Sequence, residues 1–358
     1  MASPSVVVQS VPFGFQWPTT DPFLFCVHHL DHYPPGDGRF GPAASLAGRD
    51  IGSDFAGIDG WRMYHGTTVP GFPEHPHRGF ETVTFARQGF IDHSDSLGAA
   101  SRFGRGDVQW MTAGKGVVHS EMFPLLDTVN PNTVELFQIW INLPAADKMV
   151  EPHFTMLWAE YITCHHHVDE AGRVTDVTVI AGRFEGLVPP PPPPASWASR
   201  PEADVAIWHV VMSPGAEIEL PAAAGGDAVA RVLYVFAGSL AVAGEDIAPS
   251  SAAVVRAGVP APLIAGAEGA EVLMMQGRPI GEPVAQHGPF GMNNRAEIDQ
   301  AFADFRLTGF GGWPWDSPDP VHGGQQEEGA GQRFARHADG REERPGSAGA
   351  QGRGSGAG

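Results

Sequence analysis

The sequence is poor in cysteine, in lysine and in long apolar runs. Its two cysteines, Cys26 and Cys164, lie far apart in a chain of 358 residues. Two such thiols cannot form a disulfide framework, which favours a reducing compartment. No stretch approaches the ~20 consecutive apolar residues of a membrane-spanning helix, and Val6–Val8 is too short for the apolar segment of a signal peptide. We therefore expect a soluble, cytoplasmic protein.

Positive charge is also scarce. The chain has 22 Lys and Arg residues against 41 Asp and Glu residues, a formal net charge of -19 at pH 7. A non-specific nucleic-acid binder needs cationic surface to displace counterions from phosphates, and an anionic membrane also attracts basic segments. The composition therefore excludes nucleic acid and membrane as direct partners.

The remaining composition indicates a folded β-protein. Hydrophobic residues make up 42% of the chain and charged residues 18%. These shares are typical of a globular protein, and the 46 Gly and 33 Pro residues indicate many turns. Phe80–Phe85 alternates in polarity and is rich in Thr, Val and Phe, and Thr133–Leu143 has a similar pattern. Many short strands separated by turns predict a sandwich or small barrel.

Six consecutive prolines, Pro189–Pro194, interrupt the strand-like pattern. Proline cannot donate to a sheet, so this run predicts a stiff polyproline II spacer between domains, with docking of a recognition domain as the less favoured interpretation. A second strand-rich block follows, and the end of the chain is rich in Gly, Gln, Glu and Arg. The expected units are a first domain (1–188), a linker (189–200), a second domain (201–312) and a low-complexity, disordered tail (313–358).

One helix is predicted after the second block. Asn294 is a suitable N-cap, and Glu297 three residues later completes a capping box. Ile298, Phe302 and Phe305 follow at helical spacing, so one apolar face should pack on a domain.

The residues with the clearest chemical potential lie in two short segments. His75 and His77 are two residues apart, and so are His119 and Glu121. On a strand, this spacing puts both side chains on the same face. If the two strands face each other inside a barrel, three nitrogens and one oxygen converge.

This donor set predicts a catalytic rather than a structural metal centre. Imidazole with carboxylate suits Fe(II), Mn, Ni, Co or Zn, whereas closed structural zinc sites are usually rich in Cys. Four ligands leave two open positions on an octahedral metal, where a small substrate and O₂ can meet. Non-haem iron oxygenases use this arrangement.

Other interpretations of these histidines compete with a metal site. A lone His-x-His is more often a surface pair or a hydrogen-bonded core pair, and the chain has 16 His. His165–His167 precedes a polar turn, so we expect it to be exposed. Glu81 rivals Glu121 as the carboxylate because His-x-His followed by Glu four residues later is also a metal-barrel pattern. Spacing alone does not choose between the two.

Several segments of the sequence closely resemble the pirin family. The resemblance spans roughly residues 20–312, and the segments that carry it are 75–85, 93–98, 106–121, 139–149, 179–186 and 281–293. Pirins are bicupins, which implies two β-barrel domains with a metal, usually iron, in the first. An all-β bicupin with a short C-terminal helix is therefore the expected fold.

The resemblance also implies a ligand set. The family's metal ligands fall on His75, His77, His119 and Glu121, and Glu81 becomes a supporting or structural residue. Fe(II) is the implied cofactor, with Mn, Ni, Co, Zn and Cu as alternatives. The second block holds His209 and His287 but no matching motif, so one metal per chain is expected.

Pirins resemble quercetin 2,3-dioxygenases, which implies opening of a flavonol by O₂ with release of CO. As a hypothesis, Glu121 accepts the proton of the flavonol hydroxyl. His93, Asp95 and Gln138 either line the pocket and hold ligand rings or make ordinary strand-end hydrogen bonds. The alternative function is a non-catalytic, iron-dependent redox sensor that acts through a regulatory protein partner.

Overall fold

Almost all regular structure in this computed structural model is β-strand, within the residues that the structure describes, 5–323 and 331–346. The strands of the first half are β1 (Val7–Pro12), β2 (Phe23–Tyr33), β3 (Gly71–His77), β4 (Phe80–Gln88), β5 (Phe90–Asp95), β6 (Ala100–Gly104), β7 (Asp107–Thr112), β8 (Val117–Met122), β9 (Asn132–Asn142), β10 (His153–Leu157), β11 (Thr163–Val168) and β12 (Val174–Ala181). Those of the second half are β13 (Ala206–Met212), β14 (Glu217–Leu220), β15 (Ala230–Val242), β16 (Glu245–Ile247), β17 (Ser251–Arg256), β18 (Ala261–Gly277), β19 (Ala285–His287), β20 (Phe290–Met292), β21 (Phe334–Arg336) and β22 (Glu342–Glu343). The helical elements are α1 (Arg295–Thr308) and five 3₁₀ turns, Ile58–Gly60, Trp197–Ser199, Pro201–Ala203, Gly226–Ala228 and Gly309–Gly311. The predicted all-β class is confirmed.

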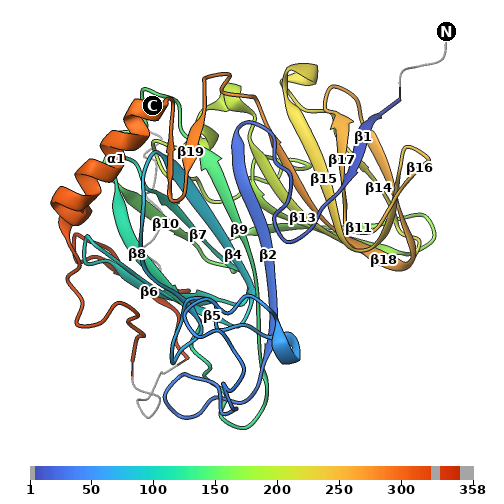
Figure 1. Cartoon of the computed structure of the whole chain (residues 1–358). Helices are drawn as coiled ribbons and strands as arrows, with labels where there is room; N and C mark the ends of the chain where they lie inside the picture. The colour runs from blue at the N-terminus through green and yellow to red at the C-terminus, as the bar shows by residue number, and fades with distance from the viewer. Residues whose placement is uncertain (1–4, 324–330, 347–358) are drawn as a thin grey trace.

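The strands form two barrels that lie side by side, the first at the left and the second at the right of Figure 1. The first barrel combines a five-stranded sheet, in the order β10-β7-β4-β9-β2, with a six-stranded sheet, in the order β22-β21-β6-β5-β8-β3. The second barrel is built from a nine-stranded sheet with the path β1-β17-β15-β18-β13-β12-β11, to which β14 and β16 add at β18 and β15. This arrangement confirms the bicupin fold.

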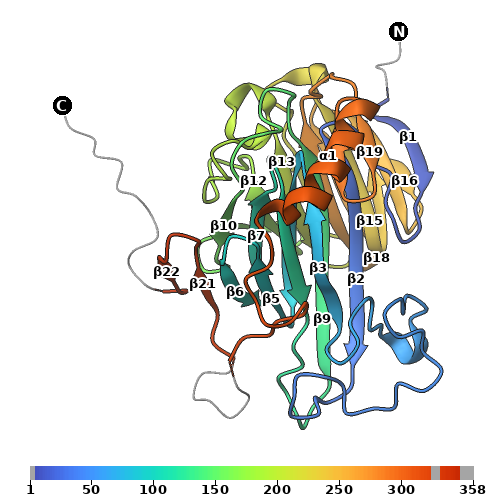
Figure 2. The ribbon, with the colours of Figure 1, turned by 60° about the vertical axis from the view of Figure 1, so that its left-hand side comes forward.

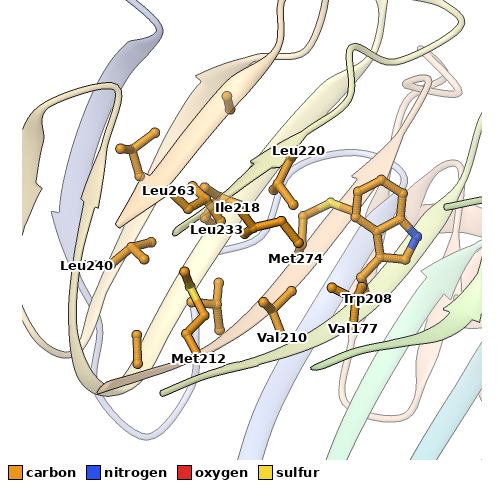
Figure 3. Close-up of a cluster of buried hydrophobic side chains, with 14 of the residues drawn as sticks. Val177, Trp208, Val210, Met212, Ile218, Leu220, Leu233, Leu240, Leu263 and Met274 are labelled. Atoms are coloured by element: carbon orange, nitrogen blue, oxygen red, sulfur yellow. The ribbon is translucent and has the colours of Figure 1, made fainter. Parts of the chain in front are cut away.

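Each barrel has its own apolar interior. Large side chains of the second barrel converge from opposite walls, with Trp208 and Met274 among those drawn in Figure 3. Burial of one such side chain contributes roughly 1.5–3 kcal/mol. The first barrel buries an equivalent set that includes Tyr33, Met63, Phe103, Met111, Phe123, Leu136 and Trp158.

A third apolar cluster joins the barrels. Strand β4 of the first barrel is buried from Phe80 to Ala86, because its side chains alternate between the barrel interior and the neighbouring barrel. Phe85 and Trp110 of the five-stranded sheet share this cluster with Ile207 and Leu273 of the nine-stranded sheet. One face of the five-stranded sheet therefore packs in the interior of the first barrel, and the other face packs against the second barrel.

The domain boundary expected after position 188 divides a continuous sheet. Strands β1, β11 and β12 all precede the proline run in the sequence, yet they lie in the nine-stranded sheet of the second barrel. Thr178 of β12 pairs with His209 of β13 across the proline run. Strand pairing joins β12 to β13 regardless of the composition of the segment between them, so composition misplaced the boundary.

The proline run lies against the protein. Pro189–Pro194 forms no strand, as expected, but Pro193 is buried. Just beyond it, the Ser196 hydroxyl donates a 2.5 Å hydrogen bond to Oε2 of Glu81 in β4. The segment therefore connects two strands of one sheet and is fastened to the first barrel, which corrects its interpretation as an interdomain spacer.

The disorder expected for the tail, 313–358, is wrong for its described residues, 313–323 and 331–346. In the first of these segments, Nε1 of Trp315 donates to the Asp95 carbonyl and the backbone N–H of His322 donates to Asp92. Strand β21 pairs with β6 at the side of the first barrel, and β22 continues the sheet (Figure 2). Ala335 is fully buried in the core of the first barrel. A few apolar residues are enough to order this segment, because β6 offers an open strand edge for pairing. Residues 324–330 and 347–358, also predicted to be disordered, lie outside the described residues.

The predicted helix is confirmed as α1. The Asn294 side chain accepts a 3.0 Å hydrogen bond from the backbone N–H of Glu297, and Gly309 ends the helix in the left-handed conformation. Ile298 and Phe302 pack with Phe290 of β20, which holds the β19–β20 hairpin next to the first barrel. No helix among the described residues is long and apolar enough to cross a membrane.

Glu81 makes folding stability depend on pH. Burial raises the pKa of its carboxyl from 4.5 to about 7, and hydrogen bonds from Ser196 and Thr112 oppose the rise. Between pH 4.5 and about 7, this carboxyl is deprotonated in the unfolded chain but still protonated in the folded protein. The free energy of unfolding that it contributes at low pH is therefore lost as the pH rises through this range. The loss is on the order of 3 kcal/mol.

We predict that Glu81→Gln flattens this dependence, because an amide of the same shape carries no titrating proton. The variant should be more stable than the native protein above pH 7 and similar to it below pH 4.5, the ordinary value of this carboxyl. Urea unfolding across the pH range measures the effect, with the exposed Glu219→Gln as the matched control. Parallel pH profiles for the native protein and Glu81→Gln would contradict it.

Candidate metal centre

Strands β3 and β8 bring the two predicted segments together. They pair antiparallel, with His75 opposite His119 and Phe72 opposite Glu121, and a bulge lies between Phe72 and His75. His77 follows His75 by two residues and faces the same side of the sheet. Side chains from two segments that are distant in the sequence therefore meet inside the first barrel.

The three imidazoles form one compact group. One nitrogen from each of His75, His77 and His119 lies within 4.8 Å of the others. The ring centroids are 4.4 Å apart for His75 and His119, and 4.9 Å apart for the other two pairs. This spacing suits three ligands around one ion.

Backbone carbonyls fix which nitrogens are free. Nδ1 of His75 donates a 2.8 Å hydrogen bond to the carbonyl of Pro73, and Nδ1 of His77 lies 3.4 Å from the carbonyl of Pro289. A carbonyl only accepts, so Nδ1 carries the proton in both rings and Nε2 keeps its lone pair. In His119 both nitrogens are buried without a hydrogen-bond partner among the described residues.

The electrostatics favour neutral rings. Burial lowers the pKa of His75 to about 4 and the pKa values of His77 and His119 well below 6.5, and the neighbouring imidazoles add to the decrease. Neutral imidazole is the form that binds metal. The buried nitrogens of His119 are costly without a partner, and a divalent metal would satisfy one lone pair on each of the three rings, so these residues fit such a cofactor.

Glu121 lies beside the triad, with Oε2 4.0 Å from Nε2 of His119. Gln138 donates a 2.9 Å hydrogen bond to Oε2, and the Thr84 hydroxyl lies 3.0 Å from Oε1. Burial raises the pKa of Glu121, and these hydrogen bonds oppose the rise. Sequence reasoning named Gln138 but missed Thr84, whose place beside Gln138 depends on the β4–β9 register.

His75 and His77 of the triad, together with Glu121, line a cavity of about 550 Å³ with mostly aromatic and aliphatic walls. The lining residues are Phe15, Phe25, Val27, His29, Phe55, His65, Phe72, Pro73, Glu74, His75, His77, Thr84, Ile91, Glu121, Phe123, Leu136, Gln138, Trp140, Gly288 and Pro289. A pocket of this size and character suits a flat organic molecule.

Three other predicted residues lie away from the cavity wall. Glu81 binds Ser196 and Thr112 on another side of the barrel. His93 is fully buried behind His119, with ring centroids 5.4 Å apart, and its Nε2 lies 3.3 Å from Oδ2 of Asp95.

Asp95 also shapes the turn after β5. Its Oδ1 accepts hydrogen bonds from the backbone N–H groups of Leu97 and Ala99. This is the strand-end role that the sequence offered as the alternative to a pocket role.

The remaining histidines do not join the triad. His165–His167 lies on β11 of the second barrel, where His166 is exposed and Nδ1 is 2.7 Å from Asp176. His209 in β13 lies 3.4 Å from Glu271, and His287 lies on the β19–β20 hairpin, 5.6 Å from the ring of Phe302.

Comparison with known proteins supports what the geometry suggests. The family model for Pirin matches residues 50–141, and that for the pirin C-terminal cupin domain matches residues 207–311. The chain belongs to the pirin family. Family membership and the histidine triad together imply a metal cofactor.

Two relatives illustrate the range of pirins that this chain resembles. A Pseudomonas aeruginosa protein named "Putative quercetin 2,3-dioxygenase" is 36% identical over 235 residues, which cover 66% of this chain and 77% of the relative. Pirin-1 of Arabidopsis thaliana is 38% identical over 243 residues, with 66% and 77% covered. Among solved structures, a quercetin 2,3-dioxygenase from Acinetobacter baumannii has a TM-score of 0.67 at 25% identity, covering 85% of this pirin and 98% of that chain.

We predict that alanine at His75, His77 or His119 removes the metal, because each change deletes one donor of a three-nitrogen group. Native protein should carry about one ion per chain, and metal affinity should fall by more than the ~10–100-fold seen when a residue that only supports a ligand is lost. Elemental analysis of the purified proteins measures it. The exposed His166→Ala is the matched control, and unchanged metal content in all three variants would refute the site.

Proposed function

We propose that this pirin is a mononuclear, metal-dependent dioxygenase of the quercetin 2,3-dioxygenase type, which opens a flavonol ring with O₂ and releases CO. His75, His77, His119 and Glu121 would hold the metal, with Fe(II) as the proposed ion. The observation that carries the proposal is the compact group of three imidazoles, two of which, His75 and His77, line an aromatic cavity together with Glu121. The names of the relatives support the same activity.

The protein's own residues would prepare the substrate. When bound, the metal lowers the pKa of a coordinated hydroxyl and mediates electron transfer to O₂. Glu121 lies beside the triad and accepts the proton of the flavonol hydroxyl. Its carboxylate lies at the cavity wall, where a substrate hydroxyl would bind, and Gln138 and Thr84 hold its two oxygens in place.

The cavity walls would bind the flat rings and exclude water. The rings of Phe25 and Trp140 pack 4.6 Å apart, and Trp140 also contacts the edge of the His77 ring at 5.3 Å. Phe72 and Phe123 form another part of the wall, with ring centroids 6.1 Å apart. Aromatic rings on several sides favour a planar aromatic substrate.

We predict that Fe(II)-loaded protein consumes quercetin when air is admitted, with loss of flavonol absorbance and production of CO. His75→Ala should abolish turnover by losing the metal. Glu121→Gln should keep most of the metal and lower kcat about 10²-fold or more, because the base is lost. The exposed Glu151→Gln is the control for a carboxylate-to-amide change and should retain activity.

The non-catalytic function gives a different result. The protein would be a redox-sensing regulator rather than a dioxygenase if it binds metal tightly without turnover and captures a protein partner in a way that depends on the oxidation state of iron. Full activity in Glu121→Gln would keep the dioxygenase and remove the proposed role of Glu121.

A further inference from the structure

A second polar group lies in the wall of the same cavity. His29 of β2 lines the cavity with only 5% of its surface exposed. Its Nδ1 is 2.8 Å from the hydroxyl oxygen of Tyr64, and the Tyr64 hydroxyl is 2.6 Å from Oδ2 of Asp31. Asp31 is fully buried and also accepts a 3.0 Å hydrogen bond from Nη1 of Arg62.

The direction of these hydrogen bonds follows from the donors available. Arg62 only donates, so the Asp31 carboxylate accepts from it. The single proton of the Tyr64 hydroxyl goes to the other carboxylate oxygen, at the shorter distance typical of a charge-assisted bond. The Tyr64 oxygen must then accept from His29, so the proton of His29 lies on Nδ1.

This tautomer leaves a free acceptor at the cavity wall. Burial lowers the pKa of His29 to about 3, so the ring is neutral and Nε2 carries a lone pair. Nε2 has no hydrogen-bond partner among the described residues. The neighbouring groups are the rings of Phe15 and Phe72, at centroid distances of 5.4 and 5.9 Å. An acceptor held in place between apolar rings at the cavity wall is open to a donor from the cavity.

His29 lies close to the candidate metal centre. The Phe72 ring lies 5.9 Å from the His29 ring and 6.4 Å from the His75 ring. His29 and the metal centre are therefore separated by one aromatic side chain along the same wall. A planar ligand that lies against Phe72 can reach both.

We propose that Nε2 of His29 accepts a hydrogen bond from a second hydroxyl of the substrate, at a distance from the hydroxyl that the metal would take. The substrate class is then an aromatic compound with hydroxyl groups at two separated positions. Tyr64 and Asp31 are positioning residues, because they set the tautomer of His29 without touching the ligand. This inference rests on the cavity of the proposed function and refines its substrate.

The test compares two ligands under anaerobic conditions with metal-loaded protein. Quercetin carries several hydroxyls, and 3-hydroxyflavone keeps only the one proposed for the metal. We expect native protein to bind quercetin more tightly, and His29→Leu to reduce that preference about 5–10-fold, the effect of one hydrogen bond. Binding of 3-hydroxyflavone should change little in the variant. Fluorescence titration gives both dissociation constants.

Conservative variants separate a recognition role from a structural one. His29→Gln retains a side-chain acceptor and should recover part of the preference. Tyr64→Phe keeps the aromatic ring but removes the acceptor that holds the proton of His29 on Nδ1. Nitrogen-15 NMR of His29 should detect the change in tautomer, and the variant should lose part of the preference for quercetin. Tyr33→Phe is the matched control, since its hydroxyl donates to the Arg62 carbonyl at 2.7 Å but Tyr33 does not line the cavity.

The inference is overturned if His29→Leu shows the native preference for quercetin, or, should the leucine variant not fold, if Tyr64→Phe shows it. It is also overturned if neither flavonol binds native protein. Because binding is measured without O₂, failure of turnover is a separate result. A His29-dependent preference without turnover would remove the dioxygenase and retain the binding site.

Discussion

The pairing of β3 with β8 is the constraint on which the candidate metal centre depends. Its register places His75 opposite His119 and so brings together side chains from two distant segments. A shift of one residue would turn one strand's set of donors to the opposite face, since side chains alternate along a strand. The apolar interior of the first barrel opposes such a shift, because the shift would turn buried residues of β8 away from the core together with the candidate ligands. The site is therefore fixed by the same burial that stabilises the barrel.

The centre also depends on a segment from the far end of the chain. The β19–β20 hairpin supplies the Pro289 carbonyl that orients His77. Close approach is required there: Gly79 has a φ of 84°, and a Cβ on it would lie 2.2 Å from the carbonyl oxygen of Gly291. The buried ammonium of Lys148 donates to both glycine carbonyls. A substitution at Gly79 would therefore disturb the orientation of the His77 ring without changing any of the candidate ligands.

Burial changes the protonation behaviour of each polar group in the cavity in a different way. It keeps the three triad imidazoles neutral, with lone pairs available, and raises the pKa of Glu121. Around His29 it favours a neutral ring whose tautomer follows from Tyr64 and Asp31. The cavity thus combines a candidate metal site, the Glu121 carboxylate and a hydrogen-bond acceptor within largely aromatic walls. Such a combination orients a ligand by a few polar contacts and binds it mainly by apolar surface.

The sequence by itself determined the β class, the capped helix and the four candidate donors, because alternation, capping and two-residue spacing are local properties. The resemblance in motifs extended this to the bicupin fold and to the choice of Glu121 over Glu81. Only the tertiary structure decided where β1, β11 and β12 belong, that the proline run is fastened to Glu81, and that residues 334–336 complete a sheet. It also decided that Thr84 supports Glu121 and that His29 lies at the cavity wall with a fixed tautomer. These features rest on contacts between residues far apart in the chain, whose register and burial no local pattern records.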